Sequence, residues 1–220
     1  MQRTAILFDL DGTLVDTAPD ICAALNWVLE KRRLPPIDPA SVRTMIGDGA
    51  AKLVERGLVA AGAQSPDVQQ AAVADFLTHY QDNISRLSRP FPGAVDALAA
   101  LKASQYRLAV CTNKLERFTV KLLDDLNMTH FFDAIVGGDT LGVQKPDARH
   151  LLGTLQRLGA EAANAAMVGD SANDVSAARN AGVPVIAVSF GYTKVAPQQL
   201  GADRLIDSFS ELLAALRALR

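Results

Sequence analysis

Residues 6–17 read ILFDLDGTLVDT. The stretch begins as an apolar run and then places two carboxylates, Asp9 and Asp11, close together, followed at once by Gly12 and Thr13. A charged side chain at the end of a buried strand is costly unless a partner compensates it. The stretch therefore predicts a buried strand that ends in a polar site.

Short apolar runs rich in Val and Ile recur along the chain, and stretches with helical spacing of apolar residues separate them. This alternation predicts an α/β fold with a Rossmann-like parallel sheet and crossover helices. The runs are continuously apolar, as expected for strands that are covered on both faces. The predicted strands are TAILFD (4–9), RLAVCT (107–112), AIV (134–136), AMVG (166–169), VPVIAV (183–188) and RLID (204–207).

One interval between strands is unusually long. Residues 10–106 separate the first two runs, whereas a crossover connection needs only roughly a dozen residues. Pro and Gly residues divide this interval into three stretches with helical spacing: PDICAALNWVLEKRRL, AAKLVERGLVAAG and VQQAAVADFLTHYQDNISRL. We therefore predict an all-helical cap at residues 16–89, inserted into an α/β catalytic core formed by residues 1–15 and 90–220.

Composition limits the possible partners. The chain has 220 residues, 49% of them hydrophobic, and a formal net charge of −2. Its basic residues form no run that would favour a nucleic acid or an anionic membrane surface. Asp9 and Asp11 interrupt the N-terminal apolar run before an export signal could form, and the cysteines Cys22 and Cys111 are too few for a disulfide framework. We expect a cytoplasmic monomer or homodimer that acts on a small molecule.

Polar side chains follow the predicted strands where a ligand site is expected. In an open parallel sheet, ligands bind at the carboxyl ends of the strands. Clustered acids repel one another unless a cation intervenes, and an all-oxygen donor set suits Mg²⁺. A metal, a cationic donor and a carboxylate nucleophile are the parts of a phosphoryl-transfer site. The groups concerned are Asp9, Asp11, Thr112, Asn113, Lys145, Asp170 and Asp174.

These segments resemble a known superfamily over essentially the whole chain. DLDGT, Thr112-Asn113, Lys145-Pro146 and GDSAND (169–174) are similar, in order, to the four motifs of the haloacid dehalogenase superfamily. Within it, further segments resemble the phosphoglycolate phosphatases: IGDGA (46–50), RPFPG (89–93), CTNK (111–114) and VGGDT (136–140). The resemblance implies a haloacid dehalogenase-like core and a cap that closes over the strand ends.

The resemblance also implies the roles of the first two acids. Asp9 would be the nucleophile that becomes an aspartyl-phosphate, and it would also bind Mg²⁺. Asp11 would bind Mg²⁺ through its main-chain carbonyl, while its side chain protonates the leaving alkoxide and later activates water. A carboxylate attacks phosphorus without losing a proton, so such a nucleophile needs placement rather than a base.

The resemblance assigns the remaining motif residues to the phosphoryl group and the metal. Thr112 and Asn113 would bind phosphoryl oxygens, and Lys145 would bridge Asp9 and the phosphoryl group. Asp170 would be a further Mg²⁺ ligand, and Asp174 would contribute to the metal site, directly or through a water molecule.

Several assignments stay open at this stage. Asp174 also fits a helix capping box with Ser171. Lys114 could contact substrate or be an exposed lysine at a helix start. Gly47 and Gly49 precede a predicted helix, where their main-chain N–H groups could bind the substrate's carboxylate, or they could simply form a turn.

The sequence therefore predicts a Mg²⁺-dependent phosphatase that hydrolyses a small phosphomonoester, 2-phosphoglycolate, to glycolate and phosphate. The alternatives are a sugar-phosphate phosphatase, a nucleotidase or pyrophosphatase, or a phosphomutase of the same superfamily. A catalytically silent binding module is disfavoured because Asp9, Asp11, Lys145 and Asp170 are all present.

Overall fold

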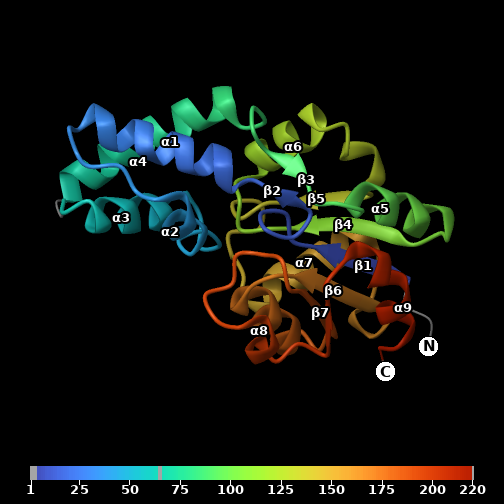
Figure 1. The fold of residues 1–220 in the computed structure, drawn as a ribbon. Helices are drawn as coiled ribbons and strands as arrows, with labels where there is room; N and C mark the ends of the chain where they lie inside the picture. The colour runs from blue at the N-terminus through green and yellow to red at the C-terminus, as the bar shows by residue number, and fades with distance from the viewer. Residues whose placement is uncertain (1–3, 64–65, 220) are drawn as a thin grey trace.

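A six-stranded parallel sheet forms the centre of the protein. The computed structural model describes residues 4–63 and 66–219, and within them the strand order is β5-β4-β1-β6-β7-β8 (Figure 1). Each predicted apolar run contains one strand, so the predicted α/β fold is confirmed. The strands are β1 (Ala5–Phe8), β4 (Arg107–Cys111), β5 (Ala134–Val136), β6 (Ala165–Gly169), β7 (Val185–Val188) and β8 (Arg204–Ile206).

The first strand lies in the middle of the sheet. Residues Ala5–Phe8 pair in register with Arg107–Val110 on one side and with Ala165–Val168 on the other. Successive side chains of a strand point to opposite faces, so Ile6 and Phe8 join one hydrophobic core cluster while Ala5 and Leu7 join the other. Because both faces are covered, the strand is continuously apolar.

Helices cover both faces of the sheet. The cluster that contains Ile6 and Phe8 includes buried residues of α5, α6 and α9, and the opposite cluster includes residues of α7 and α8. The core helices are α5 (Ala94–Ala103), α6 (Glu116–Asp125), α7 (Ala148–Leu158), α8 (Ala172–Asn180) and α9 (Leu212–Arg217). Short 3-10 helices are η1 (Thr129–Phe131), η2 (Ala162–Asn164), η3 (Pro197–Leu200) and η4 (Phe209–Glu211).

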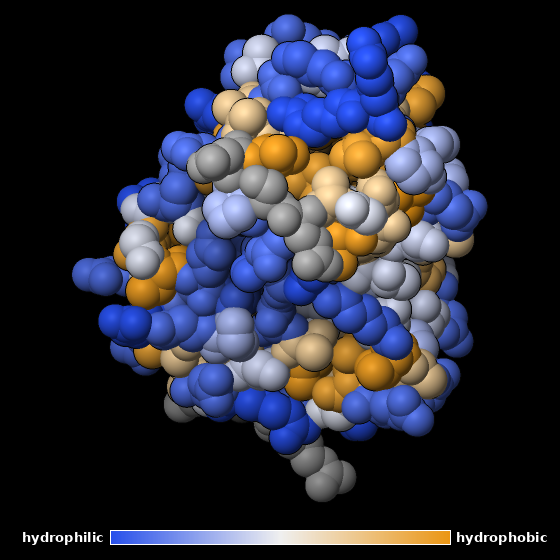
Figure 2. All heavy atoms as spheres, turned by 90° about the vertical axis from the view of Figure 1, so that its left-hand side faces the viewer, coloured by the Kyte–Doolittle hydropathy of each residue, from blue (hydrophilic) through white to orange (hydrophobic). Residues whose placement is uncertain are grey.

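The long interval after β1 is helical, as the spacing predicts. Its helices are α1 (Ala18–Lys31), α2 (Pro39–Arg43), α3 (Ala50–Ala60) and α4 (Pro66–Asn83), and they lie together to one side of the sheet, at the left of Figure 1. Gly57 lets α3 approach α1 closely, because a Cβ at this position would lie 2.7 Å from a Leu25 methyl. On the side of the molecule where these helices lie, hydrophobic patches are surrounded by hydrophilic side chains (Figure 2).

Two short strands mark where the chain enters and leaves the helical interval. β2 (Val15–Asp16) pairs antiparallel with β3 (Arg89–Pro90). Next to them, the buried carboxylate of Asp20 accepts hydrogen bonds from the main-chain N–H groups of Leu87 and Ser88 and from the Ser88 hydroxyl. The two crossing segments are therefore held side by side.

Among the described residues, no helix combines the length and the apolar character that a membrane span requires.

Candidate active site

Three buried carboxylates meet at the carboxyl edge of the sheet. Asp9 follows β1, Asp170 follows β6, and Asp174 lies in the first turn of α8. One oxygen of each lies within 4.8 Å of the others. Lys145, which follows β5 in sequence, places its Nζ 2.9 Å from Asp9 Oδ1 and 2.6 Å from Asp174 Oδ1. Four of the predicted site residues are thus in direct or near contact.

The cluster contains three carboxylates and a single ammonium group, that of Lys145. Burial raises the pKa of Asp9 to about 6, although Lys145 opposes the shift. Burial, Asp174 and Asp9 together raise the pKa of Asp170 well above its ordinary value. Burial alone would lower the pKa of Lys145, but the Asp174 and Asp9 carboxylates outweigh it and raise the pKa, so Lys145 stays an ammonium. A bound cation would favour the ionised forms of Asp9 and Asp170.

The DLDGT motif contains Asp9 and also contacts Asp170 through Thr13. Thr13 Oγ1 donates to Asp170 Oδ1 at 3.0 Å, and the main-chain N–H of Tyr192 donates to Oδ2 at 2.6 Å. Gly12 has φ +86°, and a Cβ there would lie 2.5 Å from Asp170 Oδ2. The glycine is required both by its conformation and by the close approach of this carboxylate.

Asp174 forms the predicted capping box and also contacts Lys145; its part in a metal site stays a prediction. Its Oδ2 accepts from the Ser171 N–H and hydroxyl, while Ser171 Oγ accepts from the Asp174 N–H, so the capping box is present. Its Oδ1 accepts from Lys145. The capping box therefore fixes a carboxylate that in turn positions Lys145.

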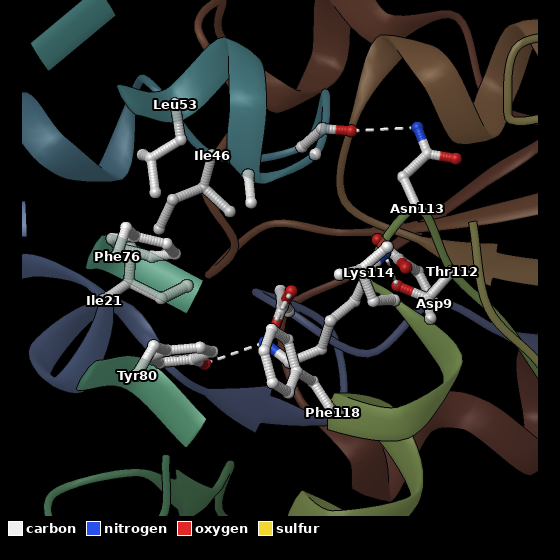
Figure 3. Close-up of a pocket in the computed structure, with 15 residues that line it drawn as sticks. Asp9, Ile21, Ile46, Leu53, Phe76, Tyr80, Thr112, Asn113, Lys114 and Phe118 are labelled. Carbon is white, nitrogen blue, oxygen red and sulfur yellow. Dashed lines mark hydrogen bonds and ion pairs between the residues drawn. The ribbon is translucent and has the colours of Figure 1, made fainter. Parts of the chain in front are cut away.

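The side chain of Asn113, which the resemblance implies as a phosphoryl ligand, is engaged with main-chain groups in this structure. Its Oδ1 accepts from the Lys145 N–H at 2.9 Å, and its Nδ2 donates to the carbonyls of Lys145 and Gly47, both at 3.0 Å. Figure 3 shows the amide turned toward Gly47 and away from Asp9. The side-chain amide is engaged with the main chain, and both Asn113 and the buried Thr112 line the cavity that contains Asp9.

Lys114 is part of the site, and its reading as an exposed lysine is wrong. Its side chain is buried, and its Nζ donates to Asp11 Oδ1 at 3.0 Å, to Oδ2 at 3.2 Å and to the Tyr80 hydroxyl at 2.7 Å. Burial lowers the pKa of Lys114, but Asp11 and Tyr80 outweigh it and raise the pKa, which keeps the side chain charged. The signals in the sequence were its position two residues after Thr112 and its place in the CTNK segment (111–114); nothing there indicated Tyr80.

A cavity of about 50 Å³ lies between the sheet edge and the helices α1, α3 and α4 (Figure 3). Asp9, Asp11, Thr112 and Lys114 line its polar end. Its other walls are mostly apolar and come largely from the helical interval: Ile21, Ile46, Gly47, Gly49, Ala50, Leu53, Phe76 and Tyr80, with Asn113, Leu115 and Phe118 from the core. The space fits a small ligand.

The loop before α3 contacts the core directly. Gly47 and Gly49 both have positive φ, at +115° and +84°. Asn173 of α8 donates to the Gly47 carbonyl at 3.3 Å and to Asp48 Oδ1 at 2.7 Å. Asp48 also pairs with Arg56 of α3, which balances its charge. Gly49 is the N-cap residue of α3 and brings no capping side chain.

Known proteins share this arrangement. Residues 6–188 match the model of the haloacid dehalogenase-like hydrolases. The chain belongs to this family. It is 47% identical to the phosphoglycolate phosphatase of Caulobacter vibrioides over 214 residues, covering 96% of this chain and 90% of that protein. It is 43% identical to the phosphoglycolate phosphatase of Agrobacterium fabrum over 211 residues, covering 96% and 91%.

A solved structure has the same fold as this chain. The crystal structure of a predicted phosphoglycolate phosphatase from Haemophilus somnus superposes with a TM-score of 0.93 at 32% identity and covers 98% of each chain. The predicted superfamily and the predicted enzyme class are therefore confirmed: this haloacid dehalogenase-like protein is a phosphatase.

Proposed function

We propose that this phosphatase hydrolyses 2-phosphoglycolate to glycolate and inorganic phosphate, with Mg²⁺ as cofactor and Asp9 as nucleophile. The observation that carries the proposal is the placement of Asp9 at the polar end of a small, largely apolar-walled cavity, in contact with Lys145. The substrate named in the relatives from Caulobacter vibrioides and Agrobacterium fabrum supports it.

The residues at the sheet edge fit a hard divalent cation. Asp9 and Asp170 would bind Mg²⁺ through carboxylate oxygens, and Asp11 through its main-chain carbonyl. The raised pKa values of Asp9 and Asp170 favour such a cation, because it would stabilise both ionised forms. Asp174, whose oxygens already accept hydrogen bonds from Lys145 and Ser171, would contribute less directly. When bound, the metal would neutralise negative charge on the phosphoryl oxygens.

The chain's own groups support a double displacement. An Asp9 oxygen attacks phosphorus and forms an aspartyl-phosphate, while the bond from phosphorus to the leaving oxygen breaks. Asp11 in its protonated form would give its proton to that oxygen, which leaves as the glycolate hydroxyl. Asp11 then takes a proton from water as the water oxygen attacks phosphorus and releases Asp9 and phosphate. Lys145 and Thr112 would contact the phosphoryl oxygens and stabilise their charge.

Residues 16–89 would act as the cap domain of a core formed by residues 1–15 and 90–220. A cap protects a reactive acyl phosphate from stray water and opens to release product. The β2–β3 pair and the Asp20 contacts at the two crossing segments would serve as the joints about which the cap moves.

The cap loop would receive part of the substrate's negative charge. Gly47 and Gly49 line the cavity, and the start of α3, whose N-cap residue is Gly49, adjoins it at Ala50. Asp48 does not oppose an anion here, since it pairs with Arg56. Gly47→Val should raise KM for 2-phosphoglycolate, because its φ of +115° is unfavourable for a β-branched residue. An unchanged KM would remove the loop from the binding site.

The alternatives, a sugar phosphate and a nucleotide, carry larger leaving groups than 2-phosphoglycolate does. The cytoplasmic location and the monomeric or homodimeric state stay predictions.

The function is tested with a panel of phosphate esters in Mg²⁺ and in chelator, on wild type and on Asp9→Asn. Preference for 2-phosphoglycolate, lost with chelator and with the substitution, is the expected result. Equal turnover of unrelated sugar phosphates would contradict the proposed substrate.

A further inference from the structure

Lys114 brings a positive charge to the cavity at a distance from the carboxylate cluster around Asp170. Among the described residues that line the cavity, no other Lys or Arg is present. Its Nζ donates to Asp11 of the core and to Tyr80 of α4, and Figure 3 shows the contact with Tyr80. Lys145, in contrast, is held by Asp9 and Asp174. The two ammonium groups therefore face different parts of a bound substrate.

The position of Lys114 matches one end of the substrate. In the proposed reaction, Asp11 protonates the oxygen that bridges phosphorus and the leaving group. In 2-phosphoglycolate, a single methylene joins this oxygen to the carboxylate. The carboxylate must then lie close to Asp11 on the cavity side, and the ammonium that contacts Asp11 at 3.0 Å lies within reach of it.

Apart from Asp11 and the Tyr80 hydroxyl, which contact Lys114 Nζ, the cavity wall on the side of the helical interval is mostly apolar. Ile21, Phe76 and Phe118 line the same part of the cavity and offer no charge to a ligand. In such surroundings an anion and an ammonium attract each other more strongly than in water, and an unpaired anion is costly. The cavity should therefore favour a leaving group whose negative charge can reach Lys114.

We propose that Lys114 binds the carboxylate of the leaving group and so sets the preference for phosphate esters of short 2-hydroxy carboxylates. Tyr80 is its positioning residue. The inference rests on the proposed function, because it takes the reacting ester and the role of Asp11 from it. It adds the residue that distinguishes a substrate with a carboxylate in its leaving group from a phosphate ester of the same size with an uncharged leaving group.

Tyr80 is well placed for this positioning. Its ring stacks on Phe76 with a centroid distance of 5.4 Å and meets Phe118 edge-on at 5.6 Å, and Lys114 Nζ lies 4.7 Å from its centroid. Burial raises the pKa of Tyr80 to about 12, so the phenol stays neutral and accepts the Lys114 proton in a hydrogen bond. Since Tyr80 belongs to α4, the binding position is complete only when this helix is in place.

The test compares two esters on the full-length enzyme in Mg²⁺. One is 2-phosphoglycolate, and the other is 2-hydroxyethyl phosphate, which replaces the carboxylate by a neutral alcohol. Lys114→Met should lower the ratio of their kcat/KM values about 100-fold, mainly through KM for 2-phosphoglycolate. Tyr80→Phe should lower the ratio about 3- to 10-fold. If Lys114→Met lowers both activities by the same factor, Lys114 acts only through Asp11 and the proposal is wrong.

Matched variants keep the test decisive. Lys121→Met removes an exposed lysine of α6 that pairs with Asp125, and it should leave the ratio unchanged. Lys114→Arg keeps the charge and should retain most of the preference, and Lys114→Gln replaces Lys114→Met if that variant does not fold. A wild type without preference for 2-phosphoglycolate would overturn the proposed function and the inference together. A wild-type preference that survives Lys114→Met and Lys114→Gln would overturn the inference alone.

Discussion

Asn113 hydrogen-bonds both main-chain groups of Lys145, accepting from its N–H at 2.9 Å and donating to its carbonyl at 3.0 Å. The same amide donates to the Gly47 carbonyl of the cap loop. One side chain thus fixes the backbone of the lysine that contacts Asp9 and also anchors the loop that adjoins the cavity.

Asn113→Ala should lower kcat about 10- to 100-fold, because a small displacement of Lys145 misplaces its ammonium relative to Asp9. Steady-state kinetics with 2-phosphoglycolate measures the effect. Asn26 is the matched control: it bonds both main-chain groups of Ile37 in the same way, far from the site. Asn26→Ala should affect stability and leave kcat near wild type. Equal losses of kcat in the two variants would contradict the positioning role of Asn113.

Thr13→Val should weaken Mg²⁺ binding about 10-fold, because it removes the hydroxyl that orients Asp170 at 3.0 Å. Isothermal titration with Mg²⁺ and the metal dependence of the rate measure this change. Thr17→Val is the control, since the buried Thr17 hydroxyl has no hydrogen-bond partner in the described structure. That substitution should leave Mg²⁺ affinity unchanged. Unaltered affinity in Thr13→Val would show that Asp170 needs no such support.

Gly12→Ala should abolish most activity and destabilise the protein by about 2–4 kcal/mol, from backbone strain and from collision with Asp170. The reference is Gly62→Ala. Gly62 has φ +83°, close to the +86° of Gly12, but no atom of the described residues lies within 4 Å of its added Cβ. It should cost only about 1 kcal/mol. Denaturant unfolding gives both values. Similar losses in the two variants would mean that Asp170 moves aside freely.

The raised pKa of Asp9 predicts a pH dependence of stability in chelator. Burial raises this pKa from 3.8 to about 6, so the folded protein binds the Asp9 proton more tightly than the unfolded chain does. The free energy of unfolding should therefore fall as the pH rises between these values, by up to about 3 kcal/mol. In chelator at pH 7, Asp9→Asn should then be more stable than wild type, and Mg²⁺ should stabilise wild type more at pH 7 than at pH 5. Thermal unfolding of wild type and Asp9→Asn between pH 4 and pH 7 in chelator measures this effect. If the difference in stability between the two proteins does not change with pH, the prediction is wrong.

Much of the fold follows from local patterns in the sequence. The strands could be found because each is covered on both faces and so is continuously apolar, as Ile6 and Leu7 illustrate on opposite sides of β1. The meeting of Asp9, Lys145 and Asp170 could be predicted because parallel strands end at a common edge. These expectations need only the order of the strands and their direction.

Other features depend on tertiary packing that no local pattern specifies. The contact between Lys114 and Tyr80 arises because α4 packs over the sheet edge, and a buried lysine after a strand looks the same in sequence as an exposed one. The engagement of Asn113 with Lys145 depends on the path of the loop after β5. Asp174 fitted both a capping box and a site residue, and the structure shows why: its two oxygens face different partners.

The steric course at phosphorus tests the central role of Asp9 most directly. A chiral, oxygen-isotope-labelled thiophosphate analogue of 2-phosphoglycolate is hydrolysed by the wild-type enzyme, and the configuration of the released thiophosphate is determined. Transfer to Asp9 followed by transfer to water consists of two in-line displacements, so the account predicts overall retention. Inversion would mean that water attacks the substrate directly, and it would contradict an aspartyl-phosphate on Asp9.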